Sequence, residues 1–412
     1  MGRFFANPKV TTAKIIDSWG TQTGTAAAGR HVLAIQDTSE VIWPTSPQRR
    51  RGLGLVGKGN AYGVLVHAML AADAGTGACL GLVGGAVWNR PGKVTTTIYE
   101  RALEDRESIR WQRTAEQAKH ILAPAARVTV VADREADIYA QWATVPDSGF
   151  DLLSRASNDR RLADGGMLFA AADRFALADT RTIKVASHAP GQPRRRAEMA
   201  LRFGEVEIAR PRDPHHHPFA PTVRLRVIDV REIAPPRGSE PLHWRLLTTH
   251  TITDAAQAWQ AVGWYQARWI IEQLFRVMKS QGLDLENSQM TSAERLVKLA
   301  ATAVKAACID MQLVQERDGK HGSDATAVFT GSEIDTLGAL NPTLAGSTPR
   351  QRNPHPPSSL AWAAWIIARL GGWNCYYKPP GPITMRRGME QFYAIHRGRT
   401  LEMKPQQDVR IP

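Results

Sequence analysis

Short apolar runs in the first third of the chain predict the strands of a mixed α/β core. Four such runs occupy residues 31–37, 63–70, 80–88 and 128–132. They have the length and apolar character of buried strands, and a Gly-Thr-Gly turn separates the second run from the third. The charged stretch 96–120 contains no Gly or Pro and therefore predicts a long helix. Strands combined with a helix in this order favour an α/β fold.

The pattern changes between residues 150 and 247, where short β-like runs alternate with turns rich in Pro and Arg. These runs are residues 181–185, 205–208 and 223–230. The segment is therefore expected to be an all-β insertion. Helical periodicity returns near Asp254 and continues past Met278, and a second helix is expected to begin near Thr291.

Two segments near the end of the sequence have contrasting compositions. Residues 338–359 are rich in Pro, Ser and Gly, which predicts a linker. Residues 360–370 (LAWAAWIIARL) are apolar enough for a buried helix, and the pair Gly371-Gly372 should end it.

Composition narrows the function classes. Lys and Arg number 52 against 39 Asp and Glu, which gives a net charge of +13 and favours a polyanionic partner. The three cysteines (Cys79, Cys308 and Cys375) are far apart, which excludes a disulfide scaffold and a zinc site. No apolar run reaches the roughly 18 residues of a membrane span, and no signal-peptide core is present. These features indicate a soluble cytoplasmic protein that binds nucleic acid.

Two acids stand where predicted strands end. Asp37 closes the run 31–37, and Asp133 directly follows the run 128–132. Carboxylates brought together at strand ends are hard oxygen ligands, suited to Mg²⁺ or Mn²⁺. The structural alternative is that each acid simply caps a junction between a strand and a loop. Asp137, four residues after Asp133, is expected to support this region rather than to react.

A third group of polar residues follows on a predicted helix. At about 100° per residue, the side chains of Tyr265, Arg268, Glu272 and Lys279 fall in one stripe about 60° wide. The apolar residues between them form the opposite, buried face. A carboxylate among two cations and a phenol suits a metal ligand beside phosphate-binding groups. The alternative is a solvated face with an Arg268–Glu272 pair one helical turn apart.

Together these residues resemble the DDE transposases of bacterial insertion sequences. The four helix residues match the Y-x2-R-x3-E-x6-K signature of the insertion sequence four branch, which transposes by a cut-and-paste route. The blocks 35–40 (IQDTSE) and 131–139 (VADREADIY) are similar to those around the family's first and second acids. The segment 368–373 (ARLGGW) resembles the closing part of the family's C-terminal domain.

The resemblance implies a set of site residues. Asp37, Asp133 and Glu272 would be the catalytic triad and would hold two divalent metal ions, Mg²⁺ or, as a substitute, Mn²⁺. The expected DNA-binding residues are Tyr265, Arg268, Arg276, Lys279, Arg155 and Trp244. Trp244 would stack on a flipped-out base. Taken alone, Trp244 is equally compatible with a core aromatic residue, and Arg155 with a surface arginine.

The resemblance also implies a domain organisation. Residues 31–149 and 248–290 would form a ribonuclease H-like α/β core, residues 150–247 a β-strand insertion subdomain, and residues 291–412 a helical dimerisation domain. Residues 1–30 would be the remnant of an N-terminal DNA-binding domain. The expected partners are the terminal inverted repeats of a transposon, target DNA and a second copy of the chain, in the bacterial cytoplasm at the nucleoid and not at a membrane.

Three functions follow as hypotheses. The first is an active, metal-dependent transposase. The second is an N-terminally truncated form that does not cleave DNA and inhibits a full-length partner by forming mixed dimers. The third is an unrelated basic DNA-binding module whose acids are structural. Cleavage of DNA with Mg²⁺ or Mn²⁺ distinguishes the first hypothesis from the other two.

Overall fold

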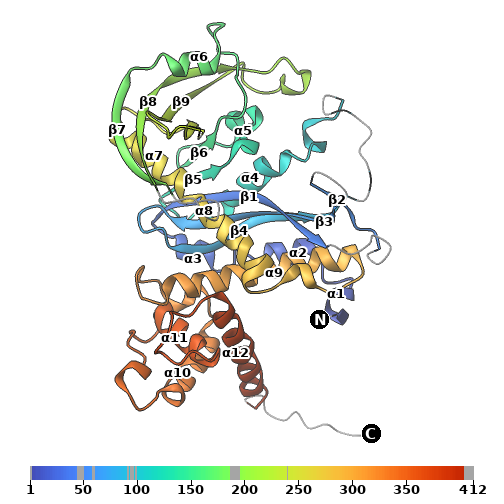
Figure 1. Cartoon of the computed structure of the whole chain (residues 1–412). Helices are drawn as coiled ribbons and strands as arrows, with labels where there is room; N and C mark the ends of the chain where they lie inside the picture. The colour runs from blue at the N-terminus through green and yellow to red at the C-terminus, as the bar shows by residue number, and fades with distance from the viewer. Residues whose placement is uncertain are drawn as a thin grey trace. The chain divides into compact units, whose positions relative to one another are not determined.

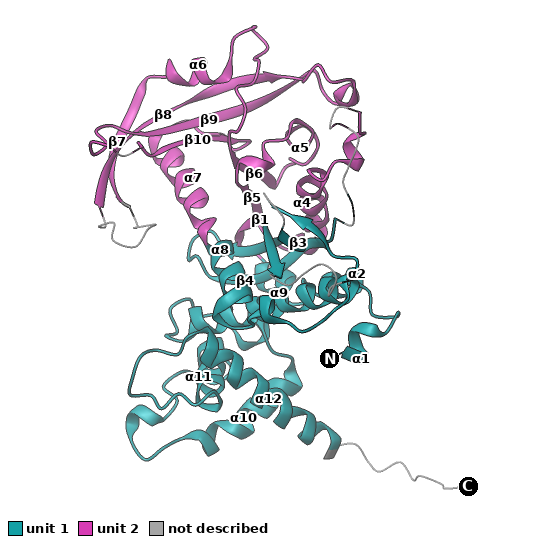
Figure 2. Cartoon of the chain, turned by 45° about the vertical axis from the view of Figure 1, so that its right-hand side comes forward, with its two compact units in different colours: residues 1–28, 38–92, 270–412 teal, residues 29–37, 93–269 magenta. Residues whose placement is uncertain are grey.

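The computed structural model describes residues 2–43, 51–57, 61–90, 92, 97, 100–185, 195–238 and 240–402. The chain forms two compact units, each assembled from segments that are distant in the sequence (Figures 1 and 2). Unit 1 comprises residues 1–28, 38–92 and 270–412. Unit 2 comprises residues 29–37 and 93–269.

The sheet of unit 2 combines parallel and antiparallel strands. Its described strands, in spatial order, are β1 (His31–Trp43, of which unit 2 holds the residues up to Asp37), β5 (Arg127–Ala132), β6 (Phe150–Arg155), β10 (His243–Thr248), β9 (Thr222–Glu232), β8 (Arg195–Ala209) and β7 (Leu177–Val185). β5 runs parallel to both β1 and β6, whereas the pairs from β6 to β7 are antiparallel. β1 and β5 are buried almost without interruption through Gln36 and Ala132, as expected of parallel strands covered on both faces.

The structure confirms the predicted α/β class and extends the predicted strands. The β-like runs of residues 150–247 belong to β7, β8 and β9, each longer than its run. β6 and β10 were not predicted. They join the antiparallel strands to β5, so the described β-strands of this segment continue the sheet that begins with β1.

Short helices connect the strands of unit 2. They are η2 (Leu103–Asp105), α4 (Ile109–Ile121), η3 (Arg134–Ala136), α5 (Tyr139–Thr144), α6 (Leu168–Asp173), η4 (Pro214–His216) and α7 (Ala255–Ala267). The predicted helix 96–120 is therefore wrong in its first half, part of which lies outside the described residues. The guanidinium of the buried Arg106 binds Asp213 at 2.8 Å and the carbonyl of Arg101 at 3.1 Å. These contacts hold the segment before Ile109 out of regular α-helical form.

Unit 1 contains a β-hairpin covered by a long helix. β3 (Ala61–Asp73) pairs antiparallel with β2 (Gly54–Val56) and β4 (Cys79–Trp88), which confirms the predicted hairpin. α9 (Ala293–Glu316) packs against β3 and β4. The other described helices of this part are α1 (Gly2–Ala6), α2 (Thr12–Asp17), α3 (Thr23–Ala27) and η6 (Leu285–Asn287).

The last part of unit 1 is helical, as predicted. Its described helices are η7 (Ala325–Ala327), α10 (Gly331–Leu344), η8 (Pro349–Gln351), α11 (Leu360–Leu370) and α12 (Pro382–Glu402). All of them except η8 contribute residues to one apolar core. The predicted linker 338–359 is wrong in its first part, because α10 runs through it to Leu344. Leu337, Leu340 and Leu344 recur at helical spacing and pack in that core, which outweighs the Gly and Pro of the segment.

The predicted helix from Asp254 past Met278 is interrupted twice. α7 ends at Ala267 with Arg268 as its C-cap, and α8 (Trp269–Arg276) follows. A π-helical turn, η5 (Val277–Gln281), then replaces regular α-helix. The uniform 100° step used for the polar stripe therefore does not hold from Tyr265 to Lys279. Among the described residues, no helix is both long and apolar enough to cross a membrane.

Candidate active site

The register of two parallel strands brings two predicted acids to the same edge of the sheet in unit 2. Ile35 of β1 pairs with Val131 of β5. Asp37 and Asp133 each lie two residues further along their strands. Because neighbouring parallel strands advance in step, the two residues lie next to each other. Asp133 directly follows the end of β5, as expected, but β1 continues past Asp37 to Trp43, so the prediction that Asp37 ends its strand is wrong.

One guanidinium lies between these two carboxylates. Arg268 donates from Nη1 to Oδ2 of Asp37 at 2.9 Å, and its Nη2 lies 3.9 Å from Oδ2 of Asp133. The hydroxyl of Tyr265 donates to Oδ1 of Asp133 at 3.1 Å. These four residues are called the carboxylate edge below. The C-terminal end of helix α7 positions two of these residues, because Tyr265 is in the last turn of the helix and Arg268 is its C-cap.

The carboxylate edge remains accessible to solvent. The side chain of Asp37 is 22% exposed and that of Asp133 is 38% exposed. Tyr265, in contrast, is buried, and this burial together with the negative charge of Asp133 raises its pKa to about 12. The phenol therefore keeps its proton at neutral pH and acts as a hydrogen-bond donor to Asp133.

The loop that carries Asp133 is fixed from behind. Asp133 caps η3 by accepting a hydrogen bond from the backbone N–H of Arg134 at 2.7 Å. Asp137 is buried and accepts from the backbone N–H groups of Ser157 and Asn158 and from the side chain of Arg160. This saturation with donors agrees with the supporting role expected for Asp137.

Two predicted DNA-binding residues lie close to the carboxylate edge. The ring of Trp244 on β10 is 6.4 Å from that of Tyr265, centre to centre, at a tilt of 57°. Arg155, at the end of β6, donates to the backbone carbonyl of His243 at 2.7 Å. Its positive charge is one of the influences that lower the pKa of Tyr265. The structure thus brings Asp37, Asp133, Tyr265, Arg268, Arg155 and Trp244 together within unit 2.

The other three predicted residues belong to unit 1. Glu272 is half-buried on α8, Arg276 is exposed at its end, and Lys279 lies in the π-helical turn η5. Burial lowers the pKa of Lys279, whereas the carboxylates of Glu286 and Glu40 raise it. That Glu272 and these two cations join the carboxylate edge stays a prediction.

The donor chemistry of the carboxylate edge suits a hard cation. Two carboxylates converge on one guanidinium, so their oxygens surround a position that favours positive charge. Within the described residues, no group of three or more His, Cys, Asp or Glu side chains is arranged to hold a metal ion. The carboxylate edge itself therefore offers two carboxylates to a cation.

The sequence patterns did not predict three charged residues that neighbour the candidate site residues. Arg134 directly follows Asp133 in the chain, and Glu40, which influences Lys279, lies in the block 35–40. Their proximity in the sequence was the available signal. Glu286 carried no such signal, because only the fold of unit 1 brings it near Lys279.

Part of the chain matches a known protein family. Residues 110–309, just under half of the chain, match the family described as the transposase DDE domain. The match includes every predicted site residue except Asp37, whose place rests on the strand register. It supports a DDE transposase domain over this stretch.

Among solved structures, the chain is similar to a piggyBac transposase in a cryo-EM structure of its synaptic complex with hairpin DNA. The TM-score is 0.37 and the sequence identity 7%, over 94% of this chain and 57% of that chain. This chain thus spans only 57% of the length of that transposase. At a TM-score below 0.5, nothing about the fold or function of this chain follows from the likeness.

Proposed function

We propose that this chain, given the transposase DDE match over residues 110–309, cleaves and joins DNA at the ends of a transposon. The observation that carries the proposal is the convergence of Asp37 and Asp133, brought together by the pairing of two parallel strands, on the guanidinium of Arg268. Asp37, Asp133 and Glu272 are the proposed catalytic triad. The net charge of +13 supports a DNA substrate.

The proposed triad would hold two divalent ions, Mg²⁺ or Mn²⁺. When bound, such ions activate the attacking oxygen and stabilise the leaving oxygen of a phosphodiester. In the nicking step, the oxygen of water forms the new bond to phosphorus and the bond to the 3′ oxygen breaks. In the joining step, a terminal 3′-hydroxyl of DNA takes the place of water.

The surrounding side chains would position the carboxylates and the DNA. The protonated phenol of Tyr265 holds the carboxylate of Asp133 in one orientation. Arg268 balances the charge of the two carboxylates and is placed to donate to phosphate oxygens when DNA enters. Lys279, Arg276 and Arg155 would add phosphate contacts, and Trp244 a stacking surface for a base.

The proposal extends to the organisation of the protein. The sheet of unit 2 supports a ribonuclease H-like core interrupted by the antiparallel strands β7 to β9. The helices α10 to α12 would form the surface through which two copies associate on DNA. The branch with the Y-R-E-K signature, an inverted-repeat substrate and action in the bacterial cytoplasm at the nucleoid are parts of the same proposal.

A nicking assay tests the proposed activity. Duplex DNA with the terminal repeats of the element that encodes the chain is incubated with Mn²⁺ or Mg²⁺. The unaltered chain should nick it, whereas Asp133→Ala and Glu272→Ala should bind DNA with nearly unchanged affinity and not cleave. Asp105→Asn, at an exposed acid in η2, serves as the charge-matched control. Binding without cleavage by the unaltered chain would replace the proposed nuclease with a DNA-binding regulator.

A further inference from the structure

Besides the carboxylate edge, unit 2 contains a basic site that is lined by arginines from four different segments. It is a pocket of about 460 Å³, within the size range of small-ligand sites. The ionisable side chains that line it are those of Arg134, Arg155, Arg231, Arg245, His243 and Asp173. It is called the arginine pocket below. Of these residues, only Arg155 was among the predicted DNA contacts.

One of the four arginines is neutralised and forms a wall of the pocket. Arg245 is buried and donates to Asp229 and to Asp173, each at 2.7 Å. Its guanidinium also lies 4.5 Å from the centre of the Phe169 ring. This residue is therefore paired with two carboxylates and contributes shape rather than uncompensated charge.

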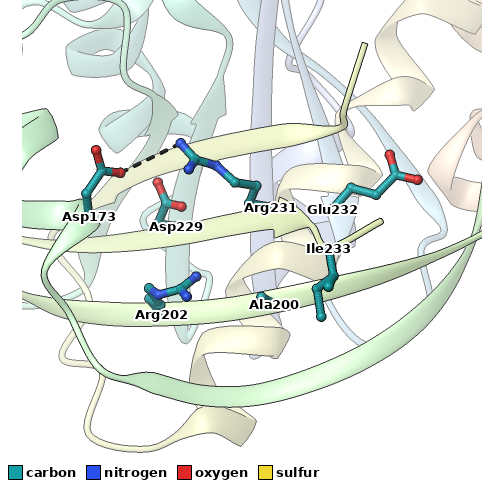
Figure 3. A pocket seen from close by; sticks show the side chains of 7 residues that line it. All are labelled: Asp173, Ala200, Arg202, Asp229, Arg231, Glu232 and Ile233. Atoms are coloured by element: carbon teal, nitrogen blue, oxygen red, sulfur yellow. Dashed lines mark ion pairs between the residues drawn. The ribbon is translucent and has the colours of Figure 1, made fainter. Parts of the chain in front are cut away.

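The other three arginines carry charge that the protein compensates weakly. Arg231 is 49% exposed, and its nearest acid, Asp173, is 3.7 Å away and already bonded to Arg245. Figure 3 shows Arg231 reaching from β9 towards Asp173 in a neighbouring pocket that shares both residues. Arg155 donates to a neutral backbone carbonyl, and the exposed guanidinium of Arg134 has no ion-pair partner within the described part of the chain. The lining of the pocket thus combines these three arginines with one carboxylate, that of Asp173.

The arginine pocket is distinct from the carboxylate edge but adjoins it. Alternate residues of a strand project to opposite faces, so His243 and Arg245 share one face of β10 and Trp244 projects from the other. Trp244 is the residue that approaches Tyr265 of the carboxylate edge. Arg134 connects the two sites, because it directly follows Asp133 in the chain.

We infer that the arginine pocket binds a phosphodiester group of the DNA, and that this group neighbours, along the same strand, the phosphodiester at the carboxylate edge. Guanidinium groups recognise phosphate by paired hydrogen bonds, and three of them around one opening suit the backbone of a polyanionic strand. Successive phosphates of one DNA strand are spaced closely enough for neighbouring sites on a protein to share a strand. The inference rests on the proposed function, since it takes DNA as the substrate.

Arg134→Gln combined with Arg231→Gln tests the inference. Both side chains are largely exposed, so their loss removes charge and hydrogen bonds from the pocket without opening the core. The matched control is Arg196→Gln with Arg224→Gln, two exposed arginines of β8 and β9 that do not line the arginine pocket. DNA binding is measured by fluorescence anisotropy at several salt concentrations.

The pocket variant should bind DNA roughly tenfold or more weakly, and the slope of log K against log salt should fall by about 1 to 2. The control should keep the slope of the unaltered chain. A scan of duplexes that each carry one uncharged methylphosphonate then locates the contact. The unaltered chain should lose affinity for a duplex neutralised next to the cleavage position, and the pocket variant should be insensitive there. Equal slopes and equal scans for the pocket variant and the control would overturn the inference.

Calorimetric titration tests whether the ligand of the pocket is DNA or a free phosphate compound. The probes are inorganic phosphate and a deoxynucleoside monophosphate. Tight binding of either probe that the pocket variant loses, with unchanged DNA binding, would assign the pocket to a free phosphate compound and overturn the DNA assignment. The unaltered chain also distinguishes the two proposals. If it neither binds nor nicks DNA, the proposed function fails. If it nicks DNA and the pocket variant behaves as the control, only the pocket inference fails.

Discussion

Two groups of aspartates in unit 2 have opposite surroundings. Asp229 on β9 is 2% exposed, receives a hydrogen bond from Arg245 at 2.7 Å, and lies 2.8 Å from Nε2 of His243. The side chains of Asp37, within β1, and Asp133, directly after β5, are 22% and 38% exposed to water. A buried charge is tolerated only with close partners, whereas an accessible carboxylate can exchange one cation for another at little cost. Asp229 therefore stabilises the fold, whereas the carboxylate edge is accessible to a cation from solvent.

The pKa of Asp229 reflects this balance. Burial alone raises it, but the hydrogen bonds from His243 and Arg245 outweigh burial and lower it.

A third kind of acid is buried and, in the described part of the chain, lacks such partners. Asp310 on α9 in unit 1 is buried, and its Oδ2 has no hydrogen-bond partner among the described residues. Burial raises its pKa to about 7, which the charge of Arg386 only partly offsets.

The largest expected effect concerns activity at the carboxylate edge. Asp133→Ala should slow DNA nicking by at least about 10³-fold, because it removes a carboxylate from the proposed metal site. Because Asp133 is accessible, the same change should leave the melting temperature nearly unaltered. Nicking assays and thermal unfolding of the same preparations check both halves. A variant that nicks normally, or that loses activity only because it unfolds, would break the comparison.

For the buried Asp229, we expect a loss of stability to be the main effect of substitution. Asp229→Ala should lower the free energy of unfolding by about 3 kcal/mol, because it leaves the buried Arg245 without its partner on β9. Urea unfolding of the variant measures this effect. Asp164→Asn, at an exposed acid of the same unit, provides the reference. Similar stabilities for Asp229→Ala and the reference would show that burial does not separate the two groups.

Asp310 should make stability fall with rising pH. Its pKa is about 7 in the folded chain, above the ordinary value of 3.8, so the unfolded chain loses this proton first. The folded state is therefore penalised progressively between about pH 4 and pH 7, and the penalty stays constant above that range. The free energy of unfolding of Asp310→Asn, relative to that of the unaltered chain, should rise by roughly 2–3 kcal/mol between pH 4 and pH 8. Urea unfolding of both chains at the two pH values tests this, and a constant difference would contradict it.

The smallest expected effect concerns the donor to Asp133. Tyr265→Phe removes the hydroxyl that donates at 3.1 Å and should slow nicking by roughly tenfold, about the worth of one hydrogen bond to a charged group. Because the pKa of Tyr265 is about 12, the slowing should be the same at any pH between about 6 and 9. Nicking rates of both chains across that range measure it. A ratio that varies with pH would mean that the phenol itself loses a proton in the reaction.

Parts of the site could be read from the sequence because they depend on local patterns. Asp37 and Asp133 each follow an apolar run that the chain uses as a strand, and parallel pairing alone brings their positions together. Tyr265 and Arg268 are three residues apart at the end of one helix, so they reach the same neighbour. Such short-range relations survive errors in the exact ends of strands and helices.

Features that depend on long-range contacts were not predictable in the same way. The ion pair between Arg106 and Asp213 joins segments about a hundred residues apart and shortens a predicted helix. The arginine pocket needs the pairing of β6, β9 and β10, two of which had no separate signal in the sequence. The interruptions after Ala267 and Arg276 changed the stripe that had been expected to carry Lys279.

Iron-directed cleavage of the polypeptide tests the metal site at the carboxylate edge most directly. Fe²⁺ in place of Mg²⁺, with ascorbate and peroxide, produces radicals that cut the backbone next to bound metal, and mass spectrometry locates the cuts. We expect cuts beside residues 37 and 133 that excess Mg²⁺ suppresses and that Asp133→Ala abolishes. Cuts confined to other segments, or cuts at these positions that Mg²⁺ and the substitution leave unchanged, would contradict a metal site at the carboxylate edge.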